Sequence, residues 1–156
     1  MKHKLPGPYG RHFFLIIVSM GLLTACMQEK DRLDEEVRRL CAKDGGIVVH
    51  ERVILPPEEF SEHGEIRVIA RHLSPSNARF FYDSEVTYLQ KGKPEMSRNH
   101  FKLYRRVDHK LLGEGVVYMR IGGDFPGPWK ESSFICPERG GIKYVSHAVF
   151  AKQAVK

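Results

Sequence analysis

The stretch RFFYDSEVTYLQK, residues 79–91, decides the fold, because polar and apolar residues alternate along it with the period of a β-strand. The residues of its apolar face are Phe80, Tyr82, Val86 and Tyr88. The residues of its polar face are Arg79, Asp83, Glu85 and Lys91. The pattern predicts a strand with one face on a core and the other in solvent, ended by Gly92 and Pro94.

The segments on either side continue this pattern. Residues 98–107 alternate again, and we expect Phe101, Leu103 and Val107 to point inward. Asp108-His109-Lys110 predicts a hairpin turn into a strand at residues 111–121, where Gly113 and Gly115 indicate a bulge or a close backbone approach. Shorter strands are expected at residues 47–55, 66–72 and 142–150.

One helix is expected before the strands, at residues 31–45. Its apolar residues recur with helical spacing at Leu33, Val37, Leu40 and Cys41. Asp31 is the expected N-cap, and Gly45-Gly46 would end the helix. On the solvent side, Asp34 with Arg38 and Glu35 with Arg39 have the spacing of ion pairs.

These elements together predict an α+β fold, in which an N-terminal helix packs on a mainly antiparallel sheet of about six strands. A small open barrel is the alternative. No linker interrupts residues 31–156, so we expect a single domain.

The first 25 residues have the order of a secretory signal. Lys2, Lys4 and Arg11 are the charges of residues 1–12, and residues 13–25 are almost wholly apolar. That run would reach about 20 Å as a helix, whereas the hydrocarbon core of a bilayer is about 30 Å thick. We therefore expect residues 1–25 to be a removed signal peptide, with an ordinary signal or an uncleaved anchor as the alternatives.

The tetrapeptide Leu23-Thr24-Ala25-Cys26 resembles the lipobox of the bacterial prolipoproteins, which reads Leu-small-small-Cys. The resemblance implies thioether lipidation of Cys26, cleavage before it and acylation of the new amino terminus. It also implies transfer to the outer membrane, because Met27 rather than Asp follows the cysteine. Residues 26–30 would be the lipidated tether, whose last four residues reach about 14 Å at most.

The resemblance also bears on the other two cysteines. With Cys26 committed to lipid, Cys41 and Cys136 remain as an even pair in an oxidising compartment, and we predict that they form a disulfide. Both begin the pattern Cys-x-x-x-Gly-Gly-Ile, so one bridge could join the entrances of two strands. A reactive Cys136 assisted by His147 is the competing interpretation.

The charge of the chain gives no support for nucleic-acid binding. Three of the 25 basic residues lie in the signal peptide, so the formal net charge falls from +6 to +3 after its removal. A mild positive balance with both signs interspersed is ordinary surface composition.

The best candidate for a binding site is the loop of residues 122–129, in which Asp124, Phe125 and Trp129 stand among glycines and prolines. Aromatic side chains on a stiff loop can anchor a partner or stack on sugar rings. Alternatively, Phe125 and Trp129 fold inward and close the end of the sheet. Residues 122–124 and 132–137 also resemble segments of small proteobacterial lipoproteins, a likeness that implies no activity.

A second candidate is the outward row of Arg98, His100, Lys102 and Arg106, which could meet phospholipid headgroups, lipopolysaccharide phosphates or an acidic glycan. The alternative is that this row is the solvated face of an antiparallel strand. Six of the eight histidines follow Cys26, but none has the spacing of a metal site, and we expect neither a metal nor a cofactor. No hydrolase or phosphate-binding motif is present in the sequence.

The sequence therefore predicts a non-enzymatic envelope lipoprotein, held to the membrane through Cys26 and facing the periplasm from the outer membrane. Its partner would be another envelope protein or an anionic glycan or lipid. The alternatives are an envelope hydrolase or sugar-binding enzyme without a known motif, and an immunity or exclusion lipoprotein.

Overall fold

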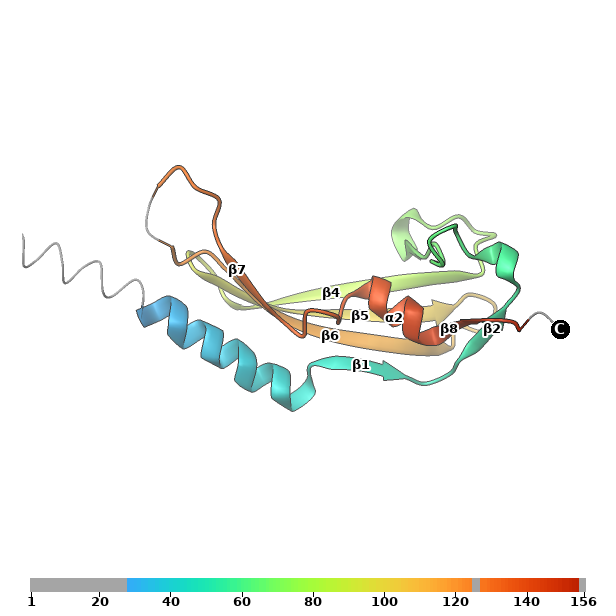
Figure 1. The fold of residues 1–156 in the computed structure, drawn as a ribbon, viewed down its shortest axis with the longest axis horizontal. Coiled ribbons are helices and arrows are strands. Elements are labelled where there is room, and N and C mark those ends of the chain that lie inside the picture. Colours follow the sequence, from blue (N-terminus) through green and yellow to red (C-terminus); the bar gives the residue numbers. More distant parts are fainter. Residues whose placement is uncertain (1–27, 125–126, 155–156) are drawn as a thin grey trace, which may run out of the picture.

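The computed structural model describes residues 28–124 and 127–154. The predicted signal peptide, Cys26 and Phe125 therefore lie outside the described residues. Within the part of the chain that is described, the main elements are an N-terminal helix at residues 28–44 and a long twisted sheet (Figure 1).

Six strands form this sheet in the order β1-β6-β5-β4-β3, and β7 also pairs with β6. They are β1 (Gly46–Val49), β3 (Ile69–Ala70), β4 (Phe80–Gln90), β5 (Glu95–Arg105), β6 (Leu111–Ile121) and β7 (Ser133–Cys136). The pairs β1–β6, β4–β5, β5–β6 and β6–β7 are antiparallel, and only the pair β3–β4 is parallel within this sheet. The predicted α+β class is confirmed, and the sheet keeps open edges rather than closing into the alternative barrel.

The remaining elements gather at one end of this sheet (Figure 1). They are the 3-10 turns η1 (Pro57–Glu59) and η2 (Arg71–Leu73), the helix α2 (Ile142–Val149), and the strands β2 (Val53–Leu55) and β8 (Phe150–Lys152). β2 and β8 pair in parallel as a separate two-stranded sheet.

The two helices pack on opposite faces of the main sheet. Val116 and Tyr118 of β6 cluster with Leu33, Val37 and Cys41 of the N-terminal helix. The alternate β6 residues, Gly113 and Gly115, lie beneath α2, where Val145 and Val149 join a second cluster with Leu103 and Phe80. Successive residues of a strand face opposite sides, so the chain has two cores, one on each face.

The sequence prediction of a last strand at residues 142–150 is wrong. Residues 142–149 form α2, and only Phe150–Lys152 is extended. The apolar residues Ile142, Val145 and Val149 also have helical spacing, and the helix buries Val145 and Val149 completely. Packing on the glycines of β6 thus outweighs the strand preference of a β-branched segment.

Two other predicted strands are shorter than expected. Residues 47–55 divide into β1 and β2, because the backbone N–H groups of His50 and Glu51 both donate to the carbonyl of Leu112. Of residues 66–72, only Ile69–Ala70 is a strand. Val107, predicted to point inward, lies in the β5–β6 turn and is 86% exposed.

The N-terminal helix begins earlier than the sequence suggested. Gln28, Glu29 and Lys30 are helical, so Asp31 is not the cap, and three of the residues assigned to an extended tether belong to the helix. Its exposed ion pairs join Glu35 to Arg38 and Glu36 to Arg39, one residue closer than predicted. The expected apolar stripe is confirmed, with Leu33 and Val37 fully buried.

The predicted disulfide is present between Cys41 and Cys136, with a Cα–Cα distance of 5.8 Å. It joins the last turn of the N-terminal helix to the end of β7. In the chain-entropy model, closing a loop of 95 residues contributes about 4 to 5 kcal/mol as an upper figure. The bridge therefore fixes the end of the helix to the sheet.

Gly115→Ala tests the close approach of α2 to β6. A Cβ at this position would clash with the carbonyl oxygen of Gly140 and would lie 2.7 Å from Val145 Cγ2. We expect the free energy of unfolding in urea to fall by about 1 to 3 kcal/mol, because the helix must move off the sheet.

The matched control is Gly141→Ala, because a Cβ there has no neighbour within 4 Å. We expect this variant to change the free energy of unfolding by less than about 1 kcal/mol. Equal losses in the two variants would contradict the packing described.

Candidate functional site

The predicted loop residues Asp124 and Trp129 have different surroundings. Lys30 Nζ donates to Asp124 at 2.7 Å, and the backbone N–H and hydroxyl of Ser132 donate to it at 2.5 and 2.9 Å. The bond from Lys30, followed by those from Ser132, holds the pKa of Asp124 well below its usual value. Trp129 is 55% exposed, so it does not fold inward to close the sheet.

Two of the four residues of the predicted basic row, Arg98 and His100, have carboxylate partners within the protein. Arg98 donates to Asp44 and to the hydroxyl of Tyr118, which itself donates to Asp44 at 2.7 Å. His100 contacts Glu114. Among the described residues, Lys102 makes no ion pair. The row is therefore not a continuous anion-binding strip, because Arg98 and His100 have carboxylate partners and Arg106 lies beyond the end of β5.

Sequence reasoning missed a cluster in which one carboxylate joins two histidines. His50 Nε2 lies 2.9 Å from Glu114 Oε1, and His100 Nε2 lies 2.7 Å from Glu114 Oε2. Burial alone would raise the pKa of Glu114, but hydrogen bonds from both imidazoles outweigh it and lower the pKa below the usual value. No sequence motif indicates this cluster, because Glu114 lies on β6, His100 lies on β5 and His50 follows β1.

The cluster does not have the arrangement of a metal centre. Across residues 28–124 and 127–154, no three His, Cys, Asp or Glu side chains are placed so that they could hold a metal ion. In the same part of the chain, no helix combines the length and apolarity needed to cross a membrane.

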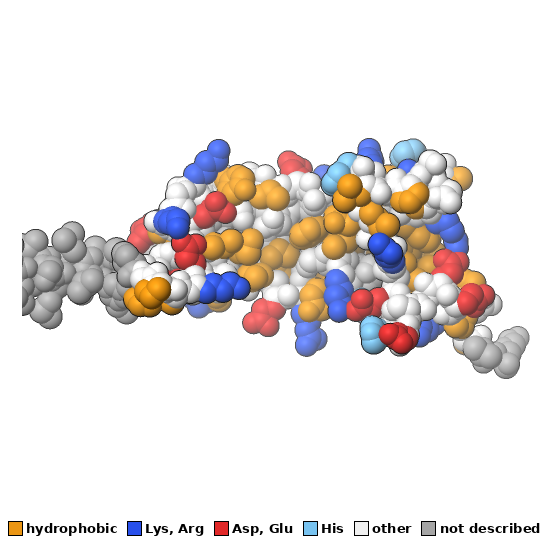
Figure 2. Space-filling view, turned by 90° about the horizontal axis from the view of Figure 1, so that it is seen from above, with side chains coloured by type: hydrophobic (Ala, Val, Ile, Leu, Met, Phe, Trp, Pro, Cys, Tyr) orange, Lys and Arg blue, Asp and Glu red, His pale blue; other side chains and the backbone are white. Residues whose placement is uncertain are grey.

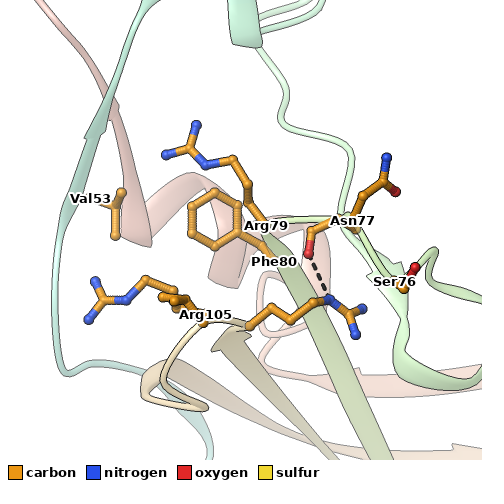
Figure 3. Close-up of a pocket in the computed structure, with 9 residues that line it drawn as sticks. Val53, Ser76, Asn77, Arg79, Phe80 and Arg105 are labelled. Atoms are coloured by element: carbon orange, nitrogen blue, oxygen red, sulfur yellow. Dashed lines mark hydrogen bonds between the residues drawn. The ribbon is translucent and has the colours of Figure 1, made fainter.

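A cavity of about 390 Å³ opens where β5 turns into β6 (Figure 3). Its residues combine an apolar floor with three arginines and two neutral polar groups. They are Val53, Ser76, Asn77, Ala78, Arg79, Phe80, Arg105, Arg106 and Val107. In Figure 3 the Phe80 ring lies in the middle of the cavity, with the Arg79 chain beside it, and the guanidinium carbon of Arg79 is 5.3 Å from the ring centre.

The three arginines of this cavity differ in their partners. Arg79 is paired with Glu59. Arg105 donates to Glu51 and Asp108, both at 2.6 Å, and its hydrogen bonds lower the pKa of Asp108 to about 2.

Arg106 is bound by neutral acceptors instead. Its Nε donates to the carbonyl oxygen of Ala78 at 2.7 Å, and its Nη2 donates to Ser74 Oγ at 2.7 Å. The guanidinium also lies 4.9 Å from the centre of the Phe81 ring. No carboxylate of the described residues forms an ion pair with Arg106, so its charge is oriented but not neutralised.

A smaller hollow of about 180 Å³ lies between α2 and residues 65–68. It holds Glu65 and His147, 4.0 Å apart, but Lys143 pairs with Glu65 at 2.5 Å. This bond lowers the pKa of Glu65. The carboxylate is thereby held ionised in a surface ion pair, which suits neither a general acid nor a free base.

No family model, curated protein or solved structure matched this chain in the three comparisons made. The chemistry of the site is therefore inferred from the residues that line it. The lining of the larger cavity contains no carboxylate, histidine or cysteine. It offers arginine side chains, amide and hydroxyl groups and an aromatic ring, which are groups that can bind a ligand with an anionic and an apolar part.

Glu114→Gln tests the two-histidine cluster through the pH dependence of stability. Folding lowers the pKa of Glu114, so the ionised carboxylate stabilises the folded protein at every pH above its pKa in the unfolded chain, about 4.3. This contribution is lost as the pH falls through the lower pKa of the folded protein. We expect the variant to lose about 1 kcal/mol at neutral pH. The two proteins should converge below pH 4 in urea unfolding.

The control is Glu85→Gln, an exposed carboxylate opposite His100 on the same face of the sheet. It should leave the free energy of unfolding nearly unchanged at every pH. A Glu114→Gln loss that persists undiminished in acid would show that the carboxylate charge is not involved.

Proposed function

We propose that this chain is a lipid-anchored lipoprotein of the bacterial envelope that binds an anionic group of another envelope component in the arginine-lined cavity, without chemical turnover. The observation that carries the proposal is Arg106, an arginine fixed by two neutral acceptors beside an apolar floor. A guanidinium held in this way is ready to bind a carboxylate or a phosphate.

The lipid anchor is supported by the cysteines. Cys41 and Cys136 pair with one another, which leaves Cys26 as the third cysteine of the chain, at the lipobox position. A disulfide between distant segments is typical of proteins exported to an oxidising compartment. Acylation at two or more positions would give firm membrane attachment, because one chain alone binds only marginally.

The cavity is suited to a ligand that has an apolar body as well as a negative charge. Phe80, Val53 and Val107 offer contact area, while Ser76 and Asn77 can exchange hydrogen bonds with neutral polar groups. Envelope lipids, acidic glycans and the acidic side chains of proteins all carry the anionic group. The cavity thus defines the charge and the size of the bound group.

The position of the cavity supports binding of the ligand at a distance from the membrane that would hold Cys26. It adjoins Phe80, at the start of β4, whereas Gln90, at the end of β4, lies beside the start of the N-terminal helix. The 11 residues of β4 separate these ends by roughly 30 Å. A ligand bound at Arg106 would then lie away from the bilayer that holds Cys26.

Site-specific photocrosslinking in living cells tests the proposal. A photoreactive residue at Val107, which lines the cavity and is 86% exposed, should form a discrete crosslinked product. Arg106→Gln should reduce that product at least about tenfold, because it removes the charge that holds the anionic group. Mass spectrometry of the product would show whether a phosphate or a carboxylate is bound.

Lys102→Gln is the matched control, since it removes a cation that lies outside the cavity and forms no ion pair with the residues the structure describes. It should leave the product unchanged. Palmitate labelling of the same cells should be normal in Arg106→Gln and absent in Cys26→Ser. Crosslinking that is unchanged in Arg106→Gln would refute the binding site, and palmitate labelling that persists in Cys26→Ser would refute the lipid anchor.

A further inference from the structure

The start of the N-terminal helix lies at one end of the molecule, together with two turns of the sheet (Figure 1). Lys30 is bound to Asp124 of the β6–β7 loop at 2.7 Å. Gln90, at the end of β4, is 3.5 Å from Glu29 and also donates to the carbonyl oxygen of Pro94. The β4–β5 turn and the β6–β7 loop are thereby fixed beside the first turn of the helix.

Chain length places this end close to the lipid. The helix is already formed at residue 28, two residues after Cys26, and two fully extended residues span about 7 Å at most. The headgroup region of one leaflet is itself roughly 5 to 8 Å thick. If Cys26 is lipidated, as the proposed function requires, residues near the helix start must lie at the bilayer surface.

The side chains exposed at this end have the chemistry of a membrane interface. Trp129 is 55% exposed, and Tyr88 is 50% exposed. Tryptophan and tyrosine concentrate at the headgroup level of membranes, where an apolar ring meets a polar layer. Figure 2 shows apolar, basic and acidic side chains side by side at the end next to the grey residues.

The charges at this end also leave cations for lipid phosphates. Glu131 is paired with Lys93 at 2.6 Å, and Asp124 is paired with Lys30. Lys91 and Lys130 are exposed and form no ion pair with any described residue. Asp31 and Glu95 of the same end also form none with the described residues, so this end presents unpaired charges of both signs. Lysines near an anionic bilayer surface each contribute about 1 kcal/mol to binding.

We propose that Trp129, Lys91 and Lys130 form a second membrane contact, in which the indole enters the headgroup layer and the two ammonium groups meet lipid phosphates. This contact, which depends on the proposed lipid anchor, would fix the orientation of the domain. The sheet then extends away from the bilayer, and the cavity at Arg106 opens on the far side. A lipid alone would leave the domain free to tumble on its tether.

Trp129 is the only tryptophan of the chain, so its fluorescence reports on this contact directly. The full chain, extracted from membranes in detergent, is reconstituted into phosphatidylethanolamine–phosphatidylglycerol vesicles that contain spin-labelled lipid. We expect a label near the headgroup to quench the emission at least about twofold, and a label at the chain end to quench it much less.

The matched control moves the tryptophan to the far end of the molecule. Ile54 lies on β2 and is 68% exposed, and the double variant Trp129→Phe, Ile54→Trp should show no quenching by either lipid. Replacing Lys91 and Lys130 with glutamate should weaken the quenching of Trp129 while the intact mass still shows lipidation.

Measuring the intact mass distinguishes failure of the second membrane contact from failure of the proposed lipid anchor. A lipidated chain in which Trp129 is not quenched would overturn the second contact and leave the anchor standing. Equal quenching at positions 129 and 54 would overturn the orientation, because the domain would then lie flat. A chain without lipid on Cys26 would overturn the proposed anchor and this inference together.

Discussion

A single buried arginine holds one end of the molecule together. Arg120 of β6 is 2% exposed and donates to both carboxylate oxygens of Asp34, at 2.7 and 3.1 Å, and to the carbonyl oxygen of Gly122. It also donates to the carbonyl and the hydroxyl of Ser132. A buried charge is tolerated only when its hydrogen-bonding groups are satisfied, so the helix and both ends of the β6–β7 loop are bound to one guanidinium. The membrane-facing end we propose depends on this arrangement.

The other end of the N-terminal helix is fixed separately. The disulfide at Cys41 joins it to β7, and Asp44 accepts hydrogen bonds from Tyr118 and Arg98. The helix is therefore attached to the sheet at both ends, with Leu33 and Val37 buried between them. On the opposite face, α2 covers the other half of the sheet and leaves the cavity at the sheet's end open. The architecture thus separates the end that we propose to contact the bilayer from the end that we propose to bind a ligand.

Local patterns were enough to predict part of this structure. The alternation of residues 79–91 predicted the strand β4 but not its buried side, since Val86 and Tyr88 are exposed and Phe81 is buried. The helical stripe predicted the packing of Leu33 and Val37, and the count of cysteines predicted the disulfide. Contacts between distant segments were not readable in the same way. Arg120 lies on the same face of β6 as the buried Val116 and Tyr118, but a charged side chain in that row is not expected to be buried, and its partner Asp34 lies 86 residues away in the chain. Similarly, the sequence singled out Arg106 for its charge. Its fixed orientation comes from hydrogen bonds to Ala78 and Ser74, and the sequence alone does not show that these residues are close to it.

The most direct test of this account is a double-mutant cycle between Asp34 and Arg120, measured by urea unfolding. Asp34→Asn should lower the free energy of unfolding by about 3 kcal/mol, because it leaves a buried cation without its carboxylate. In an Arg120→Met background, the same substitution should lower the free energy of unfolding by less than about 1 kcal/mol, because no buried cation is left without a partner. Equal losses in the two backgrounds would show that this ion pair does not hold the helix to the sheet, and would contradict the account.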